Sequence, residues 1–297
     1  MQSHEHHSTR LPGLAHLLTA LLAVAIVLPL SAAARTTLSF QFEALPDSRI
    51  GSSSAEVQSG TSSVQVGHGN FQLGYSHSRY SWSDPASLPP ALATADGRDP
   101  WEKLQRLSLG YRDRLAGPQW NTYYGVGISA SYEQELDDSV SVFSYFMRGY
   151  NHSPDWESGL GVAVSYSSLK EYVLPMVFVR YRAPHQMGLS GSLGFPRTEL
   201  RYRTHPQFSV GTRAAFGQGH FRLRDDSPLQ PAGFVELKGY QAVGFAEYRL
   251  AAGTLLSLEA STFVERHWKI YDADGSRQGR VDLENGISTS LVWRQVF

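Results

Sequence analysis

The chain has 297 residues and nearly balanced charge, with 26 Lys and Arg residues against 27 Asp and Glu residues. A net charge of −1 gives no electrostatic basis for nucleic-acid binding, and the absence of cysteine excludes disulfides and thiolate chemistry. Aromatic residues are plentiful, with 15 Tyr, 14 Phe and 6 Trp, yet a mean hydropathy of −0.28 is too low for a bundle of transmembrane helices.

We interpret residues 1–34 as a cleaved secretory signal peptide. Arg10 precedes an apolar run at residues 11–30, and the small residues that end at Ala34 form a cleavage site. A retained helical anchor is the alternative, since the run is nearly long enough to span a bilayer, but two prolines interrupt it. Cleavage leaves residues 35–297, in which no other segment could span a membrane as a helix.

Segments of about ten residues in the mature chain alternate between apolar and small or polar side chains. In YYGVGISASY, Tyr124, Val126 and Ile128 alternate with glycine and serine. Similar alternation occurs in residues 159–166, 199–203, 208–216 and 256–265. Period two is typical of strands whose two faces meet different surroundings. A soluble secreted sandwich is the alternative, but its strands are usually shorter, whereas about ten residues suit a tilted strand crossing a bilayer.

Short turns alternate with long polar connections along the chain. The long connections are residues 83–101, 217–233 and 268–280. This asymmetry is typical of a single transmembrane antiparallel up-and-down β-barrel with both termini in the periplasm. Pro196 leaves two interpretations open, because it can form a tight turn between two strands or a bulge within one. We expect about 12 strands, within a range of 10–14, over residues 35–297.

The last segment, STSLVWRQVF, has the pattern of a strand, with Leu291, Trp293 and Phe297 on one face. This ending resembles the C-terminal sorting signal of Gram-negative outer-membrane barrel proteins, from which Gln295 departs. Residues 188–216 and 233–272 also resemble a family of outer-membrane β-barrels of unknown function. The resemblance implies location in the outer membrane, contact with its lipids including lipopolysaccharide, and insertion by the barrel assembly machinery. It implies no catalytic motif and no cofactor.

Charged residues on the polar faces are expected to project into the barrel lumen, because a charge on the lipid face costs about 2–4 kcal/mol at mid-bilayer. The candidates are Arg180, Arg182, Glu199, Arg201, Arg203, Arg213, Glu247, Arg249, Glu259 and Glu265. Pairs of opposite charge would fill a narrow lumen and close it, whereas unpaired arginines would line a pore and favour anions. A barrel of this size lies near the boundary between filled and open.

These expectations give two main functional hypotheses. The first is a passive pore or transporter for small solutes across the outer membrane. The second is a closed structural or surface-interaction barrel, whose long loops would contact something outside the cell. A lipid-modifying hydrolase of the outer membrane is the third hypothesis, which the sequence does not favour. The stretch YNHSPDW superficially resembles the Asn-His-x-Ser motif of outer-membrane phospholipases, but adjacent His152 and Ser153 project to opposite faces of a strand and cannot share a proton.

Other short motifs predict no cofactor or metal site. Residues 125–130, GVGISA, match a dinucleotide fingerprint by letters, but they lie in a strand with no helix after them. Asp225 and Asp226 are interpreted as an exposed acidic turn, although they could hold a cation or bridge lipopolysaccharide phosphates. Asp272 and Asp274 resemble the start of a calcium loop, but the glutamate at its twelfth position is missing.

Overall fold

The computed structural model describes residues 35–183 and 187–297, so the expected signal peptide at residues 1–34 lies outside the described residues. The described residues form fifteen strands and one short 3₁₀ helix, η1 (Pro85–Ser87). The strands are β1 (Thr36–Arg49), β2 (Glu56–His68), β3 (Phe71–Ser83), β4 (Lys103–Ala116), β5 (Trp120–Tyr132), β6 (Val140–Asn151), β7 (Trp156–Ser167), β8 (Glu171–Tyr181), β9 (Gly188–Phe195), β10 (Arg197–His205), β11 (Phe208–Arg222), β12 (Phe234–Ala251), β13 (Thr254–Tyr271), β14 (Arg277–Asp282) and β15 (Ile287–Val296). No helix in the described part of the chain is long and apolar enough to cross a membrane.

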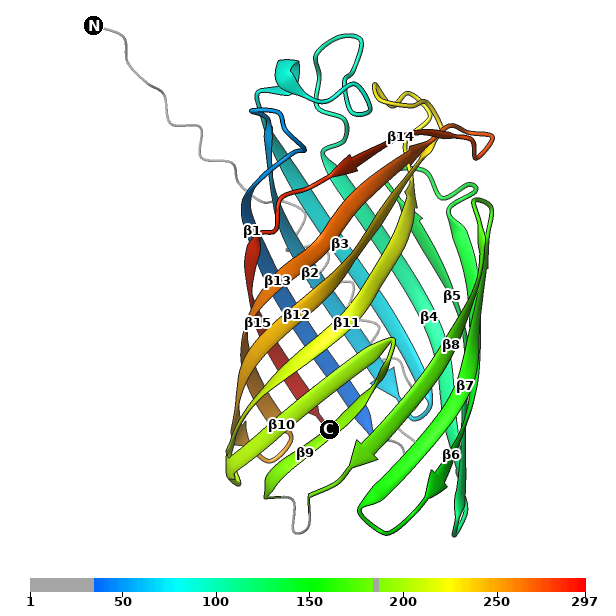
Figure 1. The fold of residues 1–297 in the computed structure, drawn as a ribbon, viewed down its shortest axis with the longest axis vertical. Coiled ribbons are helices and arrows are strands. Elements are labelled where there is room, and N and C mark those ends of the chain that lie inside the picture. The colour runs from blue at the N-terminus through cyan, green and yellow to red at the C-terminus, as the bar shows by residue number, and fades with distance from the viewer. Residues whose placement is uncertain (1–34, 184–186) are drawn as a thin grey trace, which may run out of the picture. The chain divides into compact units, whose positions relative to one another are not determined.

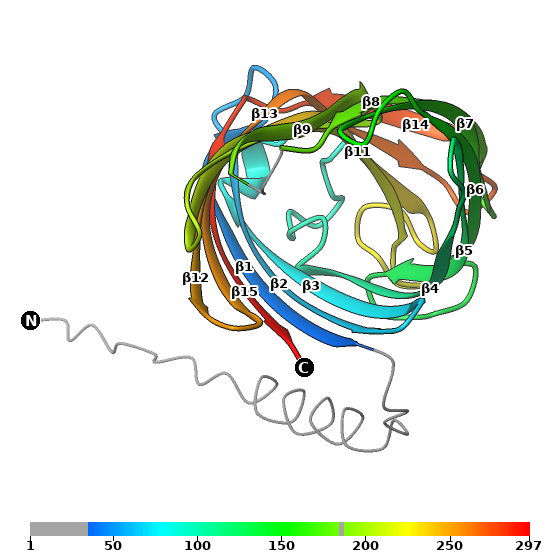
Figure 2. The same ribbon diagram turned by 90° about the horizontal axis from the view of Figure 1, so that it is seen from below.

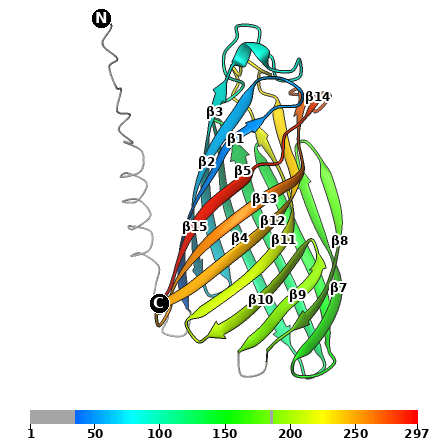
Figure 3. The same ribbon diagram turned by 60° about the vertical axis from the view of Figure 1, so that its left-hand side comes forward.

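All strands except β14 form a closed antiparallel barrel of 14 strands (Figure 1). Each strand pairs with its neighbours in sequence, which is the up-and-down order expected from short turns. The ring closes where β15 pairs with β1 (Figure 3). In this pairing Phe40 lies opposite Trp293. β14 pairs only with β13 and continues that hairpin beyond the ring.

The predicted number of about 12 strands is wrong, and 14 is the upper limit of the expected range. Pro196 forms the turn between β9 and β10 rather than a bulge within one strand. β9 and β10 contain only 8 and 9 residues, so together they have the sequence length of one long strand. Proline has no N–H for a ladder hydrogen bond, which favours a turn at this position.

The two ends of the barrel differ. The end that carries the short turns, called the turn end below, also holds both ends of the barrel segment, Thr36 and Val296 (Figure 2). The opposite end, called the loop end, carries the long connections 84–102 and 223–233 and the β13–β14 hairpin (Figure 1). The expected alternation of short turns and long loops is therefore observed, but two expected loops are shorter than 217–233 and 268–280. Residues 217–222 belong to β11, and residues 268–271 and 277–280 belong to β13 and β14.

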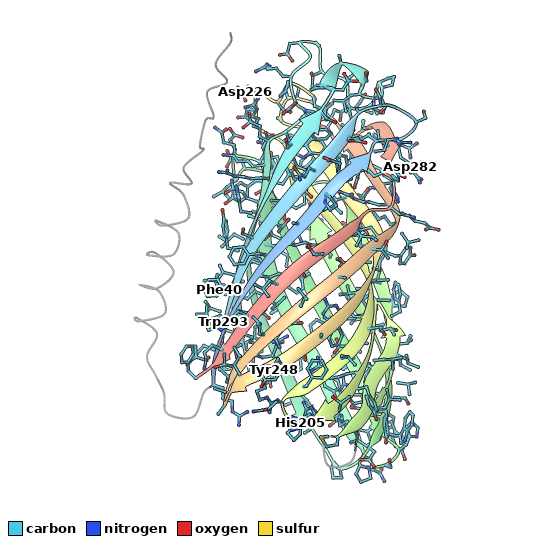
Figure 4. All side chains as sticks on the ribbon, turned by 90° about the vertical axis from the view of Figure 1, so that its left-hand side faces the viewer. Phe40, His205, Asp226, Tyr248, Asp282 and Trp293 are labelled. Carbon is cyan, nitrogen blue, oxygen red and sulfur yellow. The ribbon has the colours of Figure 1, made fainter. Side chains whose placement is uncertain are left out.

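The outer face of the barrel is apolar and exposed. On β5, Val126 and Ile128 point outward, and on β7 Leu160 is 70% exposed. Aromatic side chains lie near the ends of this band, among them Tyr248 and Trp293 toward the turn end (Figure 4). An exposed apolar band flanked by aromatic residues is the surface that a transmembrane barrel presents to lipid.

The inner face contains many small residues that make room for larger neighbours. A Cβ atom added to Gly125 would lie 2.5 Å from the Tyr145 ring, and one added to Gly127 would lie 2.4 Å from the Phe143 ring. Both aromatic rings come from the inner face of β6, the next strand. Glycine on β5 is therefore needed for aromatic side chains to occupy part of the lumen.

Candidate functional site

The lumen near the turn end contains arginines that are paired with carboxylates across strands. Arg201 on β10 contacts Glu199 at 3.2 Å and Glu247 on β12 at 2.6 Å. Arg213 on β11 contacts Glu259 on β13 at 2.8 Å. The same carboxylates also accept hydrogen bonds from hydroxyl groups, of Ser209 to Glu247 and of Ser290 to Glu259. These charges therefore neutralise one another along the wall.

A second polar cluster surrounds Glu157 on β7, whose side chain is 0% exposed. Its carboxylate accepts hydrogen bonds from Asn121 Nδ2 at 2.8 Å and the Tyr123 hydroxyl at 2.6 Å. Arg180 Nη1 lies 3.2 Å away, and Arg182 also bonds to the same carboxylate. One buried carboxylate thus connects two arginines with Asn121 and Tyr123 of β5, which lies two strands away from β7 in the sheet.

These two clusters meet at a cavity of about 680 Å³ near the turn end. Of the ten charged candidates, the ones that line this cavity are Arg180, Arg182, Glu199, Arg201 and Arg203. Arg249 is exposed near the β12–β13 turn. Glu265 is exposed and has a φ of 53° where β13 bulges against β12, so it lies at an irregular point of the ladder.

An aromatic cluster fills the lumen at the loop end. Trp82, Trp101 and Trp268 stack edge to face or tilted, with ring centroids 5.0–5.7 Å apart. Tyr80 contacts Trp101 at 5.9 Å and Trp268 at 6.3 Å, and the Trp82 indole N–H donates to the Trp101 carbonyl at 2.7 Å. We call these four residues the tryptophan cluster.

Aliphatic side chains from both walls pack around the tryptophan cluster. Leu104 comes from β4, whereas Val235 and Ile270 come from β12 and β13, and each is at most 1% exposed. Leu88 and Leu92 in the connection after β3 belong to the same buried core. The two walls are therefore packed together at this height, and the cluster occupies the loop end of the lumen.

A second cavity, of about 400 Å³, lies directly beneath the tryptophan cluster. Its lining includes Tyr80 and Trp268 of that cluster, Phe263, and two arginines, Arg106 and Arg266. We call it the loop-end cavity. Its arginines lie over aromatic rings, as Arg180 and Arg201 of the turn-end cavity also do.

The barrel wall is incompletely paired between β8 and β11. β9 pairs with β8 only from Val177 to Tyr181, and the β10–β11 ladder ends at Ala215. Beyond this point, residues 172–176 of β8 and 217–221 of β11 have no ladder partner on the sides that face the short β9–β10 hairpin (Figure 1). We call this interruption the wall gap.

A third cavity, of about 330 Å³, lies behind the wall gap. Phe143, Leu174, Met176 and Phe216 supply apolar lining, and Pro196 forms part of its boundary. Because Arg106 lines this lateral cavity as well as the loop-end cavity, the two spaces meet at one guanidinium group.

Glu236 on β12, which is 2% exposed, connects the two sides of the wall gap at the loop end. Its carboxylate accepts hydrogen bonds from the Tyr172 hydroxyl at 2.6 Å, the Tyr271 hydroxyl at 2.9 Å and Gln218 Nε2 at 3.0 Å. Lys170 Nζ lies 3.4 Å away. The gap is therefore bounded by polar contacts above and by the β9–β10 turn below.

The end of β11 is also fixed to the opposite side of the barrel. Arg222 pairs with Tyr132 at the end of β5, and the Glu133 N–H donates to the Arg222 carbonyl at 2.8 Å. The Glu133 carboxylate accepts the Arg224 N–H at 3.1 Å. Burial raises the pKa of Glu133, an effect that the Arg224 N–H and guanidinium oppose.

The residues of the phospholipase-like stretch do not form a catalytic pair. His152 Nε2 lies 2.7 Å from the Ser158 hydroxyl, whereas the Ser153 hydroxyl accepts the N–H groups of Asp155 and Trp156. The stretch is the turn between β6 and β7 at the turn end. Residues 125–130 lie within β5, so no helix N-terminus is available there for a phosphate.

The acidic loop residues are engaged locally. Asp225 pairs with Arg222 at 2.5 Å, and Asp226 pairs with Arg224 at 3.2 Å. Asp272 accepts the Ser276 N–H at 2.8 Å. Across residues 35–183 and 187–297, no group of three or more His, Asp or Glu side chains is arranged to hold a metal ion.

The predicted sorting residues lie on the last strand and just after it. Leu291 points outward from β15, and Trp293 stacks on Phe40 with ring centroids 5.6 Å apart. Phe297 is 69% exposed, and its N–H donates to the Thr36 carbonyl at 2.9 Å. Their recognition by the assembly machinery stays a prediction.

Sequence reasoning missed the tryptophan cluster, Arg106 and Arg266. The sequence does contain a local pattern for part of the tryptophan cluster and for Arg106. Trp82 and Trp101 flank the proline-rich connection, and Arg106 occupies the polar phase of LQRLSLGY, opposite Leu107 and Leu109. The contact between Trp268 and the other two indoles depends on how opposite walls meet, which no local pattern specifies.

Comparison with known proteins gives only distant structural likenesses. No protein-family model matches the chain, and no curated protein matches it. Among solved structures, the porin NanC is 9% identical with a TM-score of 0.39, covering 88% of this chain and 98% of that one. OprB of Pseudomonas putida is 9% identical with a TM-score of 0.37, covering 89% and 94%. The Pseudomonas putida toluene transporter TodX is 10% identical with a TM-score of 0.33, covering 88% and 89%. At these scores the likenesses carry no conclusion about function.

Proposed function

We propose that this protein is an outer-membrane barrel that transports small solutes through a gated lumen. The observation that carries the proposal is internal space at two heights, about 680 Å³ near the turn end and about 400 Å³ near the loop end, with the tryptophan cluster above. Space of this kind is not needed to stabilise a barrel. An aromatic constriction above such space is the arrangement by which hydrophobic gates close a pore through dewetting.

The membrane location belongs to the same proposal. The exposed apolar band and its aromatic ends support insertion in a bilayer, and the signal peptide expected at residues 1–34 supports export. We further propose that lipopolysaccharide and other outer-membrane lipids contact the band, and that the barrel assembly machinery inserts the chain. We assign no catalytic role to any residue.

A closed structural barrel is the second candidate. It is favoured by the ion pairs of Arg201 and Arg213, which neutralise charge along the turn-end lumen, and by the packed loop end. In that case the long loops would be the functional surface. The two candidates differ in one property, which is whether solutes and ions ever cross the barrel.

Electrical recording from the purified full chain in planar bilayers separates them. We expect brief conductance steps separated by long closed periods, because the tryptophan cluster must separate before water and ions pass. Swelling of liposomes that contain the protein should show uptake of small neutral and charged solutes. Absence of both conductance and swelling, in samples whose gel mobility shifts on boiling as a folded barrel does, would leave the closed barrel as the function.

A further inference from the structure

Two arginines in the loop-end cavity lack the carboxylate partners that Arg180, Arg201 and Arg213 have nearer the turn end. Arg106 Nε donates to the Ser131 hydroxyl at 2.9 Å, and its guanidinium lies 5.0 Å from the Phe221 ring centroid. Arg266 lies over the rings of Phe263 and Trp268, at 5.4 and 5.5 Å.

Neither guanidinium forms an ion pair with a carboxylate among the described residues. Arg266 Nη1 is buried and has no hydrogen-bond partner at all. A buried cationic donor left unpaired is unfavourable, and buried charges are ordinarily paired. This arrangement therefore points to an anion that is bound in the working protein.

The charge balance of the cavity agrees with this interpretation. Arg106, Arg266 and Lys238 line it together with one carboxylate, that of Glu43. Glu43 already accepts a hydrogen bond from the Ser288 hydroxyl at 2.6 Å. The lining thus carries three cationic groups and one anionic group, a net excess that a ligand with a single negative charge would reduce.

The remaining walls indicate the body of the ligand. Tyr80, Phe221, Phe263 and Trp268 present aromatic surface. At Gly217, Gly219 and Gly239, β11 and β12 contribute no side chain to the lining. Gly219 leaves room for the guanidinium in this position, because a Cβ there would lie 2.2 Å from Arg106 Nη2. An apolar, compact body fits between these surfaces.

We propose that the loop-end cavity binds a small carboxylate with a compact apolar body, held through its carboxylate by Arg106 and Arg266. A guanidinium presents paired N–H donors that match the two oxygens of a carboxylate. A volume of about 400 Å³ lies within the range of small-ligand sites. Such a ligand would be the solute class of the proposed transport function. Passage of the ligand through the barrel rests on that proposed function, whereas binding of the ligand in the cavity does not.

Isothermal titration calorimetry of the detergent-solubilised full chain with 3-phenylpropionate tests the site, with empty micelles as the blank. We expect saturable binding, and no binding of the neutral analogue 3-phenylpropanamide. Arg106→Gln and Arg266→Gln should each weaken binding by about tenfold or more, since each removes charged hydrogen bonds to the ligand. Arg112→Gln is the matched control, because Arg112 lies on the same face of β4 but lines none of the three cavities.

Three outcomes would overturn the proposal: no binding of 3-phenylpropionate, equal binding of the amide, or equal losses in the Arg112 variant. Inorganic phosphate is the competitor that tests selectivity. If phosphate binds as tightly as 3-phenylpropionate, the phenyl group contributes nothing to affinity and the site is an unselective anion site. That result would also overturn the proposal. Binding without conductance or liposome swelling would uphold the site and reject the transport function. Conductance without binding would do the reverse.

Discussion

Glu157 is the residue with the most concentrated set of polar contacts in the turn-end lumen. Its buried carboxylate joins Arg180, Arg182, Asn121 and Tyr123. Glu157→Gln keeps the shape of the side chain but removes the charge that both arginines face. We expect the barrel to lose about 1–3 kcal/mol of stability, less than for a fully buried pair because the two arginines are about a third exposed.

The measurement is the temperature at which the fast-migrating folded band disappears in unboiled gel samples. Asp96→Asn is the matched control, because the Asp96–Arg98 pair lies in an exposed loop, with the two side chains 44% and 62% exposed. This control should leave the unfolding temperature unchanged. Equal shifts for both variants would show that the buried cluster contributes nothing particular.

At the residue scale, the sequence predicts which face of a strand a side chain occupies, but not which residues of other strands it contacts. Alternation in TELRYR groups Glu199, Arg201 and Arg203 because period two depends only on neighbouring residues, and all three line one cavity. The contact of Arg201 with Glu247 joins residues 46 apart. It depends on the register of β10, β11 and β12, which the alternation of any one strand leaves undetermined. Arg106 was missed although the alternation in LQRLSLGY places it in the polar phase.

At the scale of elements, the wall gap follows from the short β9–β10 hairpin. Backbone N–H groups of β8 that face the gap have no ladder partner, so they should exchange with solvent deuterium more readily than paired ones. We expect residues 172–176 to exchange at least about tenfold faster than Val177–Tyr181 of the same strand. Hydrogen–deuterium exchange followed by mass spectrometry resolves these two segments.

β7 supplies the internal control, because both of its halves are paired with β6 and β8. Its two halves should exchange at similar rates. Equal protection along β8 would mean that another segment covers the free edge or that the gap is closed in solution. The sequence contained the cause of the gap, Pro196, but not the gap itself, since a turn and a bulge at this proline are locally equivalent.

At the scale of the whole molecule, closure of the ring and closure of the lumen are separate properties. The ring closes through backbone pairing of β15 with β1 and β13. Alternation and turn spacing in the sequence predicted a closed antiparallel barrel of this type. The lumen closes because Trp82 and Trp101, which border one long connection, meet Trp268 from the opposite wall. Contacts between walls depend on the register of many strands around the ring, so the pattern within any one strand does not specify them.

Trp101→Ala tests whether this contact is the gate. Trp101 is 1% exposed and touches both other indoles, so its removal should destabilise the loop end by about 3–5 kcal/mol and let water enter between the walls. We expect a larger open probability in planar bilayers than for the wild type, with the barrel still folded, because the ladders around the ring do not include this side chain.

Trp120→Ala is the matched control, since Trp120 lies on the outer face at the turn end and is 46% exposed. If the Trp101 variant is folded, as judged by heat-modifiable mobility, and conducts no more than the control, the barrier to solutes lies elsewhere along the lumen. The paired arginines at the turn end would then be the next constriction to open.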